Sequence, residues 1–194
     1  MALPKTIEPV RPVRSKVVPV GRDWLYEPKL DGFRGVLFIE NGRGRFLSKN
    51  EKPMPRFKEL AAELAGTLRV TDAIFDGEIV VAGETGPDFY ALFFRRGTPQ
   101  YAAFDLLWLN GTDLRELPLS RRKTALRRIT KNSPISYVDP YPSPDLFDAT
   151  VRADLEGIVA KRRQDPYAID TVWVKVKHAG YSQMKGRHDL FRRG

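Results

Sequence analysis

Tyr26-Glu27-Pro28-Lys29-Leu30-Asp31-Gly32-Phe33-Arg34 is the stretch on which the interpretation of this sequence depends. A β-like run begins before it at residues 23–25, and an apolar run of strand length follows at residues 35–39. Asp-Gly between two such runs is typical of a turn. We therefore expect Lys29 at the end of a strand, on a tight bend. A lone lysine on a turn is usually only solvated, so its role depends on the rest of the chain.

The composition is that of an ordered globular protein with a polyanionic partner. The 194 residues are 42% hydrophobic and 11% aromatic, enough for one large domain or two small lobes. The net charge of +9 favours nucleic acid as a partner. There is no cysteine, no apolar run of membrane-span length and no apolar core of a secretory signal near the first residue. The lack of cysteine fits a reducing cytosol, and we expect a monomer with no membrane partner.

Helical and strand periodicities alternate along the chain, but short turns join the strands as often as helices do. This favours an α+β fold with mainly antiparallel sheets. A proline-rich, basic arm is expected at residues 1–22, a domain at 23–180 and a basic tail or linker at 181–194. The expected elements are a β-meander at 23–50 with a hairpin at 41–44, helices at 56–68, 88–95, 118–130 and from 143, and strands at 73–82, 101–109, 156–161 and 172–177.

The helix predicted at 118–130 carries an unusual cluster of positive charge. A charged helix face is usually only solvated, but five cations with no acid between them make a role facing phosphates plausible. The five are Arg121, Arg122, Lys123, Arg127 and Arg128.

The remaining residue types limit the chemistry. The two histidines, His178 and His188, lie in the basic tail, so a Ser-His-Asp triad and a histidine metal site are disfavoured. Lys175 and Lys177 are two apart in a predicted strand and point to one face, which is either a solvated face or the two sides of a bound anion. Acids within apolar strands, Glu78 and Glu156, need a partner or a metal ion.

These groups could activate a lysine. A neutral lysine is a good nucleophile toward phosphorus or carbonyl carbon, and nearby cations or a metal ion lower its pKa. Lys29 beside Lys175, Lys177 and a carboxylate-held Mg²⁺ would meet that need. Phe104, inside a predicted strand, is either core or a flat surface on which a base stacks.

Five segments, in this order, resemble the signature motifs of the covalent nucleotidyltransferases, which are the DNA ligases, RNA ligases and mRNA capping enzymes. They span residues 27–177, and their residues are most similar to those of the ATP-dependent DNA ligases of bacteria and archaea. The segments are Lys29-Leu30-Asp31-Gly32-Phe33-Arg34, Phe75-Asp76-Gly77-Glu78, Phe104-Asp105-Leu106-Leu107, Glu156-Gly157-Ile158-Val159-Ala160-Lys161 and Trp173-Val174-Lys175-Val176-Lys177.

The resemblance implies a nucleotidyltransferase fold with an ATP pocket between antiparallel sheets, and a role for each matched position. Lys29 would attack the α-phosphate of ATP and become lysyl-AMP. AMP would then pass to a 5′-phosphate of nicked double-stranded DNA, which a 3′-hydroxyl seals. The remaining roles are Glu27 at the adenine edge, Arg34 and Glu78 at the ribose, Phe104 and Val159 on the two adenine faces, Glu156 at Mg²⁺ or Mn²⁺, and Lys175 and Lys177 at the α-phosphate.

Two departures from the family pattern qualify these roles. The family usually has Ser-Arg-Asn-Gly where this chain has Ser48-Lys49-Asn50-Glu51, so Lys49 keeps a charge for a phosphate contact but lacks the arginine fork. The family's oligonucleotide-binding barrel is absent from the 194 residues, so a separate barrel domain or a repair protein is an expected partner. An RNA ligase, a capping-type guanylyltransferase and a non-catalytic nucleic-acid-binding module stay open as alternatives.

Overall fold

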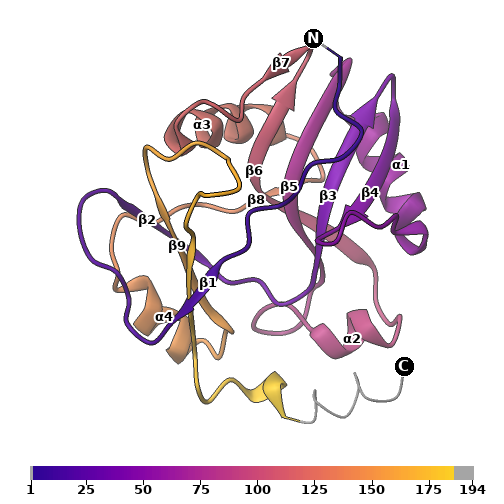
Figure 1. Cartoon of the computed structure of the whole chain (residues 1–194). Helices are drawn as coiled ribbons and strands as arrows, with labels where there is room; N and C mark the ends of the chain where they lie inside the picture. The colour runs from indigo at the N-terminus through magenta and orange to yellow at the C-terminus, as the bar shows by residue number, and fades with distance from the viewer. Residues whose placement is uncertain (1, 186–194) are drawn as a thin grey trace.

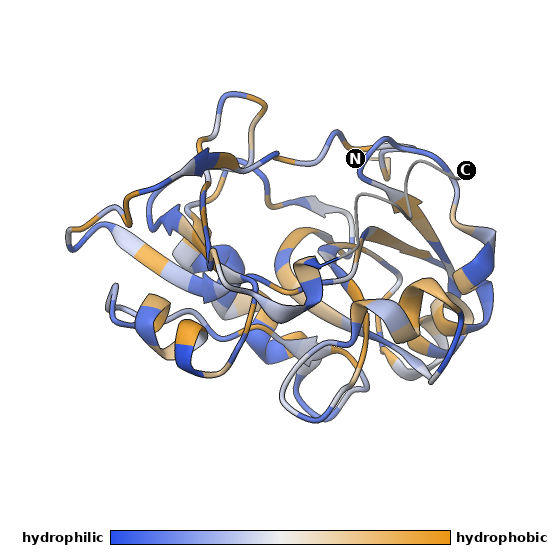
Figure 2. Cartoon of the chain, turned by 90° about the horizontal axis from the view of Figure 1, so that it is seen from below, coloured by the Kyte–Doolittle hydropathy of each residue, from blue (hydrophilic) through white to orange (hydrophobic). Residues whose placement is uncertain are grey.

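The computed structural model describes residues 2–185, which form two curved β-sheets with helices packed against them (Figure 1). Hydrophobic and hydrophilic positions alternate along the strands and helices (Figure 2), as expected where one face of each element is buried. The α+β class with mainly antiparallel sheets is confirmed. The helical elements are η1 Pro55–Phe57, α1 Lys58–Thr67, α2 Phe89–Phe93, α3 Leu119–Thr130, α4 Leu146–Arg152 and η2 Ser182–Met184.

The larger sheet has the strand order β4-β3-β5-β6-β7, with β8 pairing β6. Its hairpin between β3 and β4 turns at Asn41 and Gly42, which both have positive φ, as a two-residue hairpin loop requires. The predicted hairpin is therefore confirmed. The strands are β3 Phe33–Glu40, β4 Arg43–Ser48, β5 Asp72–Val81, β6 Pro99–Leu109, β7 Thr112–Asp113 and β8 Ser136–Tyr137.

The smaller sheet has the order β1-β10-β9-β2. Its strands are β1 Val13–Ser15, β2 Trp24–Pro28, β9 Gly157–Arg162 and β10 Val174–Lys177. β2 pairs with β9 whereas β3 belongs to the larger sheet, so the meander predicted for residues 23–50 is wrong. The chain instead crosses from one sheet to the other between β2 and β3, and this crossing carries Lys29.

The residues at this crossing explain why it is not a hairpin turn. Asp31 is buried, and its Oδ2 accepts a hydrogen bond of 2.8 Å from the Tyr181 hydroxyl. Gly32 lies so close to β5 that a Cβ there would be 2.2 Å from the Ile79 carbonyl oxygen. Asp31-Gly32 therefore serves long-range packing between the sheets, not the closure of a local turn.

Both faces of the larger sheet are buried. Along β3, Leu37 and Ile39 face the core beneath α1, while Val36 and Phe38 face a second cluster. This second cluster includes Ile7 and Val10 of the N-terminal arm together with Tyr167 and Trp173. The arm therefore packs against the fold, and β1 runs parallel to β10. Of the predicted tail, residues 186–194 lie outside the described part of the chain.

Candidate active site between the two sheets

A pocket of about 180 Å³ lies between the two sheets and gathers residues from all five motifs. The predicted site residues that line it are Glu27, Lys29, Arg34, Glu78, Phe104, Val159 and Lys175. An adjoining hollow is lined by Lys29, Glu78, Lys49 and Glu156. A larger groove of about 680 Å³ beside α3 contains none of these residues. The structure thus brings together side chains that are up to 148 positions apart in sequence at one opening.

Lys29 stands at the junction of these two hollows, held by a carboxylate. Its Nζ is 2.5 Å from Glu156 Oε2, and Lys177 Nζ is 2.7 Å from Glu156 Oε1. The Glu156 side chain is 3% exposed, whereas those of Lys29 and Lys177 are 22% and 28% exposed. Burial would raise the pKa of Glu156, but the two ammonium groups outweigh it and hold the pKa below its usual value. We call Glu156, Lys29 and Lys177 the open cluster.

Backbone geometry places Glu156 at this point. Gly157 has φ +131°, a conformation that L side chains rarely adopt, and a Cβ there would lie 2.1 Å from the Val176 carbonyl oxygen. The glycine therefore lets β9 approach β10 closely where Glu156 meets Lys177. Lys175 lies on the same face of β10 as Lys177. Its pKa is lowered by burial and by the neighbouring charges of Lys29 and Lys177.

Glu78 is a half-buried carboxylate that points into the same space. Burial raises its pKa to about 7, although Lys29 and Arg34 act in the opposite direction. The register of β5 against β6 shifts between Asp76 and Gly77, so the ladder is irregular directly before Glu78.

Arg34 is already engaged by another acid. Its Nε and Nη2 donate to Asp76 at 2.6 and 2.5 Å, and Asp76 also accepts a hydrogen bond of 2.6 Å from the Tyr167 hydroxyl. Burial disfavours the charged guanidinium, but Asp76 outweighs this and raises the pKa of Arg34. The Arg34–Asp76 pair holds the guanidinium in the pocket wall, 4.8 Å from the centroid of the Phe104 ring.

Glu27 lies at the deep end of the pocket between two lysines. Glu27 Oε1 is 2.7 Å from Lys123 Nζ, and Oε2 is 2.6 Å from Lys161 Nζ. All three side chains are at most 4% exposed. Burial lowers the pKa of Lys161, partly offset by Glu27. We call Glu27, Lys123 and Lys161 the buried cluster.

The sequence prediction gave Lys161, Lys123 and Trp173 no role in the pocket, and it counted Lys123 among the cations of a phosphate-facing helix. Lys161 is two residues after Val159 in β9, so strand alternation alone could have placed both side chains on the pocket face. No pattern in the sequence signals Lys123, because a lysine in a basic helix is usually solvated. Trp173 lines the pocket, and its ring meets that of Phe104 edge-on with centroids 5.9 Å apart.

Phe104 is half-buried, so it is both part of the pocket wall and a neighbour of the second core cluster. Arg34 and Lys161 both lie within 4.8 Å of the centroid of its ring. A base that stacks on Phe104 would displace one of these cations from the ring face.

Two positions differ from the sequence prediction. Arg122 and Lys123 of the basic helix are buried, and Arg122 forms an ion pair with Asp105 in which both side chains are 0% exposed. Only Arg121, Arg127 and Arg128 of the five cations are exposed, so the prediction of a five-cation surface is wrong. Lys49 is also exposed and lines the adjoining hollow but not the inter-sheet pocket.

The carboxylates present suit a metal ion that is held mainly by a substrate. Among residues 2–185 no three acidic or histidine side chains converge. Both Glu156 oxygens contact lysines, and Glu78 lies close enough to act on Glu156 electrostatically. One or two carboxylates plus substrate phosphates is how proteins commonly hold Mg²⁺. No helix within these residues is long and apolar enough to cross a membrane.

Two curved antiparallel sheets with a lysine-centred pocket between them define a nucleotidyltransferase catalytic fold. A family model described as the ATP-dependent DNA ligase domain matches residues 4–177. The chain belongs to this family.

Known relatives agree with this membership. The chain is 33% identical to DNA ligase C of Mycobacterium tuberculosis, over 97% of this chain and 62% of that protein. It is 33% identical to the multifunctional non-homologous end joining protein LigD of Pseudomonas aeruginosa, over 87% of this chain and 22% of that protein. The chain thus spans less than two thirds of either relative.

Solved structures have the same fold. A mycobacterial DNA ligase D, complexed with ATP and MES, superposes with a TM-score of 0.77 and 26% identity over 90% of this chain and 61% of that one. A Chlorella virus DNA ligase-adenylate superposes with a TM-score of 0.62 and 16% identity over 88% of this chain and 69% of that one, a likeness of fold alone.

Proposed function

We propose that this chain is the adenylation domain of an ATP-dependent DNA ligase, in which Lys29 becomes covalently bonded to AMP. The open cluster carries this proposal, because it holds a lysine nitrogen 2.5 Å from a carboxylate at the mouth of the pocket between the two sheets. Family membership supports it. A purely nucleic-acid-binding module would gain nothing from a half-buried lysine and carboxylate in this arrangement.

The open cluster suits the first chemical step. The Lys29 ammonium would pass a proton toward Glu156, and the neutral nitrogen would then attack the α-phosphorus of ATP. An N–P bond forms, the bond from that phosphorus to the bridging oxygen breaks, and pyrophosphate leaves with the electron pair. Once Lys29 is bonded to phosphorus, Lys177 and Lys175 remain to neutralise the phosphate oxygens.

The deep end of the pocket favours ATP over GTP. Among the described residues, Glu27 Oε1 and Lys161 Nζ are buried and make no hydrogen bond of good geometry. Such atoms are normally satisfied by a partner. With Glu27 at position 6 of the base and Lys161 at N1, the pair complements the amine and N1 of adenine, whereas guanine would place its O6 against the carboxylate and its N1–H against the ammonium. This argues against the capping-type guanylyltransferase.

The later steps need DNA. AMP would pass from Lys29 to the 5′-phosphate at a nick, and attack by the 3′-hydroxyl would release AMP and seal the strand. We infer that a separate oligonucleotide-binding domain or repair protein assists these steps, that the chain acts as a monomer, and that it works on the nucleoid in the cytoplasm. Glu156, with Glu78, would hold Mg²⁺ or Mn²⁺ against the nucleotide phosphates, where the ion supplies charge neutralisation.

The intact mass of the purified chain tests the proposal. The mass is measured as isolated, after ATP with Mg²⁺, and after added pyrophosphate. One AMP unit gained with ATP and lost with pyrophosphate is the expected result. If no adduct forms even with an added barrel domain, the chain is a binding module and the proposed function is wrong. A nick-sealing assay on DNA and RNA duplexes then separates a DNA ligase from an RNA ligase.

A further inference from the structure

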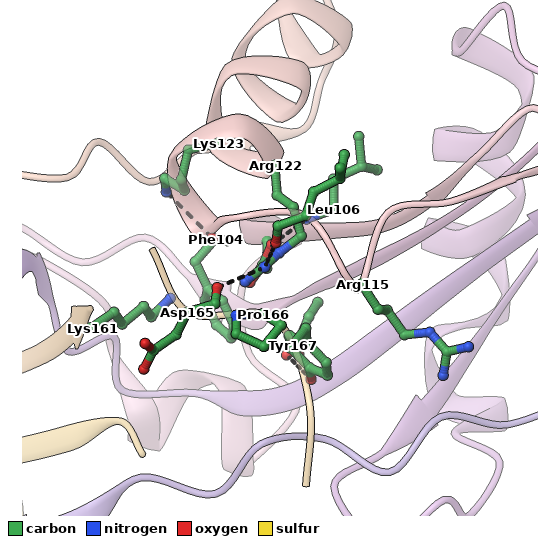
Figure 3. Close-up of polar contacts among 12 residues, drawn as sticks. Phe104, Leu106, Arg115, Arg122, Lys123, Lys161, Asp165, Pro166 and Tyr167 are labelled. Carbon is green, nitrogen blue, oxygen red and sulfur yellow. Dashed lines mark hydrogen bonds and ion pairs between the residues drawn. The ribbon is translucent and has the colours of Figure 1, made fainter. Parts of the chain in front are cut away.

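Helix α3 reaches the deep end of the nucleotide pocket through one buried lysine. Lys123 is 4% exposed in its side chain, and its Nζ is surrounded by three oxygens. It donates hydrogen bonds to the Val138 carbonyl at 2.5 Å and the Phe104 carbonyl at 3.3 Å, the second of which Figure 3 shows, and it forms an ion pair with Glu27 Oε1 at 2.7 Å. Two hydrogen bonds and one ion pair fix the position of the ammonium beside Glu27.

Two of these oxygens belong to residues that line the pocket, Glu27 and Phe104, whereas Lys123 itself lines only the groove on the other side of the wall. Lys123 therefore contacts the residues predicted at the adenine edge and face without contacting a base itself. At this point the Lys123–Glu27 ion pair alone separates the groove from the pocket.

The neighbouring residue anchors α3 so that Lys123 points at this wall. Arg122 donates from Nε and Nη2 to Asp105 at 2.8 and 2.9 Å, and from Nη1 to the Asp165 carbonyl at 3.1 Å. Consecutive residues of α3 thus hold consecutive residues of β6, Phe104 and Asp105. Figure 3 shows Arg122 and Lys123 at the end of the helix next to Phe104. A bidentate arginine–carboxylate pair is geometrically rigid.

We propose that Lys123 is a positioning residue for base selection: it holds the Glu27 carboxylate where an exocyclic amine can donate to it. The inference rests on the proposed function, since it takes the pocket to be an ATP site. An ionised carboxylate fixed in this place accepts hydrogen bonds only, so it favours a purine with an amine at position 6 and disfavours a purine with oxygen there. Without Lys123, Oε1 would lose its ion-pair partner and its fixed direction.

Equilibrium binding of base analogues tests this without requiring chemistry. The dissociation constants of ATP, purine riboside 5′-triphosphate and ITP are measured by calorimetry without divalent metal. A hydrogen bond to a charged group corresponds to roughly a tenfold or greater preference for ATP over the analogue that lacks the amine. We expect the wild-type chain to show this preference and Lys123→Met to reduce it to about threefold or less.

Three further variants isolate the effect. Lys123→Gln keeps donors for the two carbonyls but removes the charge opposite Glu27. It should also lose the preference for ATP, so it tests the inference even where the methionine variant does not fold. Lys123→Arg should recover much of it, and Lys131→Met, an exposed lysine at the end of the same helix, should leave it unchanged. In a Glu27→Gln background, Lys123→Met should reduce the preference no further, because residues that act through one another are not additive.

The outcomes separate the two proposals. If Lys123→Gln and Lys123→Met keep the wild-type preference for ATP, Lys123 has only a structural role and the inference is wrong. The same conclusion follows if these variants reduce the preference as much in the Glu27→Gln background as in the wild-type chain. A wild-type chain that prefers ATP in this assay but never gains AMP by mass would overturn the proposed function while supporting the positioning role. A chain that binds no triphosphate would overturn both.

Discussion

Two clusters of the same composition, one glutamate between two lysines, lie at opposite ends of the pocket. In the buried cluster the side chains are 2–4% exposed, whereas both lysines of the open cluster are more than a fifth exposed. The carboxylate–ammonium distances hardly differ, at 2.5–2.7 Å in both. Access to solvent, not the carboxylate–ammonium distance, therefore distinguishes them.

This difference separates recognition from reaction. A buried ion pair cannot be broken without leaving an uncompensated charge in a medium of low dielectric constant, so its groups stay where they are. A partly exposed lysine can exchange its carboxylate for a phosphate oxygen at a small cost in free energy, because water and the incoming anion replace the lost partner. The open cluster can thus exchange partners during a reaction, whereas the buried cluster supplies a fixed template for a base.

The largest expected effect comes from Lys29 in the open cluster. Lys29→Ala removes the nucleophile, and Lys29→Arg keeps the charge but not the nucleophilicity. Each should lower AMP labelling at least about 10⁴-fold, which is roughly 5.4 kcal/mol in activation free energy. Labelling is followed by intact mass, and the melting temperature is the control for folding. If either variant is labelled at the wild-type rate, another residue is the acceptor of AMP.

The next effect should appear in the buried cluster as a loss of stability. Glu27→Gln leaves two buried ammonium groups without a carboxylate and should cost about 3–5 kcal/mol in the free energy of unfolding. Glu156→Gln, its counterpart in the open cluster, should cost only about 1 kcal/mol, because its lysines can turn to water. Urea unfolding of both variants measures the contrast. Equal costs would remove the distinction between the clusters.

Glu78, between the clusters, should make stability depend on pH. Its pKa in the folded state is about 7, above the usual 4.5, so between these values the unfolded chain binds fewer protons. Stability is therefore lost as the pH rises through this window. Between pH 5 and pH 8, Glu78→Gln should become more stable relative to wild type by up to about 2 kcal/mol, measured by urea unfolding. A difference that does not change with pH would place Glu78 in contact with solvent.

The smallest effect is expected outside both clusters, on the exposed side of α3. Replacing Arg121, Arg127 and Arg128 together by glutamine should leave AMP labelling unchanged. If this surface contacts DNA phosphates, the slope of log affinity against log salt concentration should fall by up to about one per lost contact. The control replaces three exposed cations away from α3, which are Arg43 at the start of β4, Lys58 at the start of α1 and Arg69 just after α1. Equal slopes in both triple variants would assign no DNA contact to α3.

The sequence was sufficient for most of the helices and strands and for the seven predicted site residues that line the pocket, because short motifs at strand ends keep their order and strand alternation fixes the face. It did not predict that β2 and β3 join different sheets. Asp-Gly is a local turn signal, but the partner of β2 is β9, more than 130 positions later. The sequence also gave no sign that Lys123 and Lys161 are buried, since burial of a lysine depends on a carboxylate from another strand. Lys49 was placed with the nucleotide pocket on motif order alone and lies beside it.

The parallel pair of β1 and β10 has a consequence for how the protein is made. β1 is synthesised before β10, which carries Lys175 and Lys177, and most of the described fold lies between them. The pocket wall that they share needs contacts between residues about 160 positions apart, so it closes only after β10 has been synthesised. A nascent chain can therefore fold its larger sheet early, yet it has no complete site for a nucleotide until translation has passed β10.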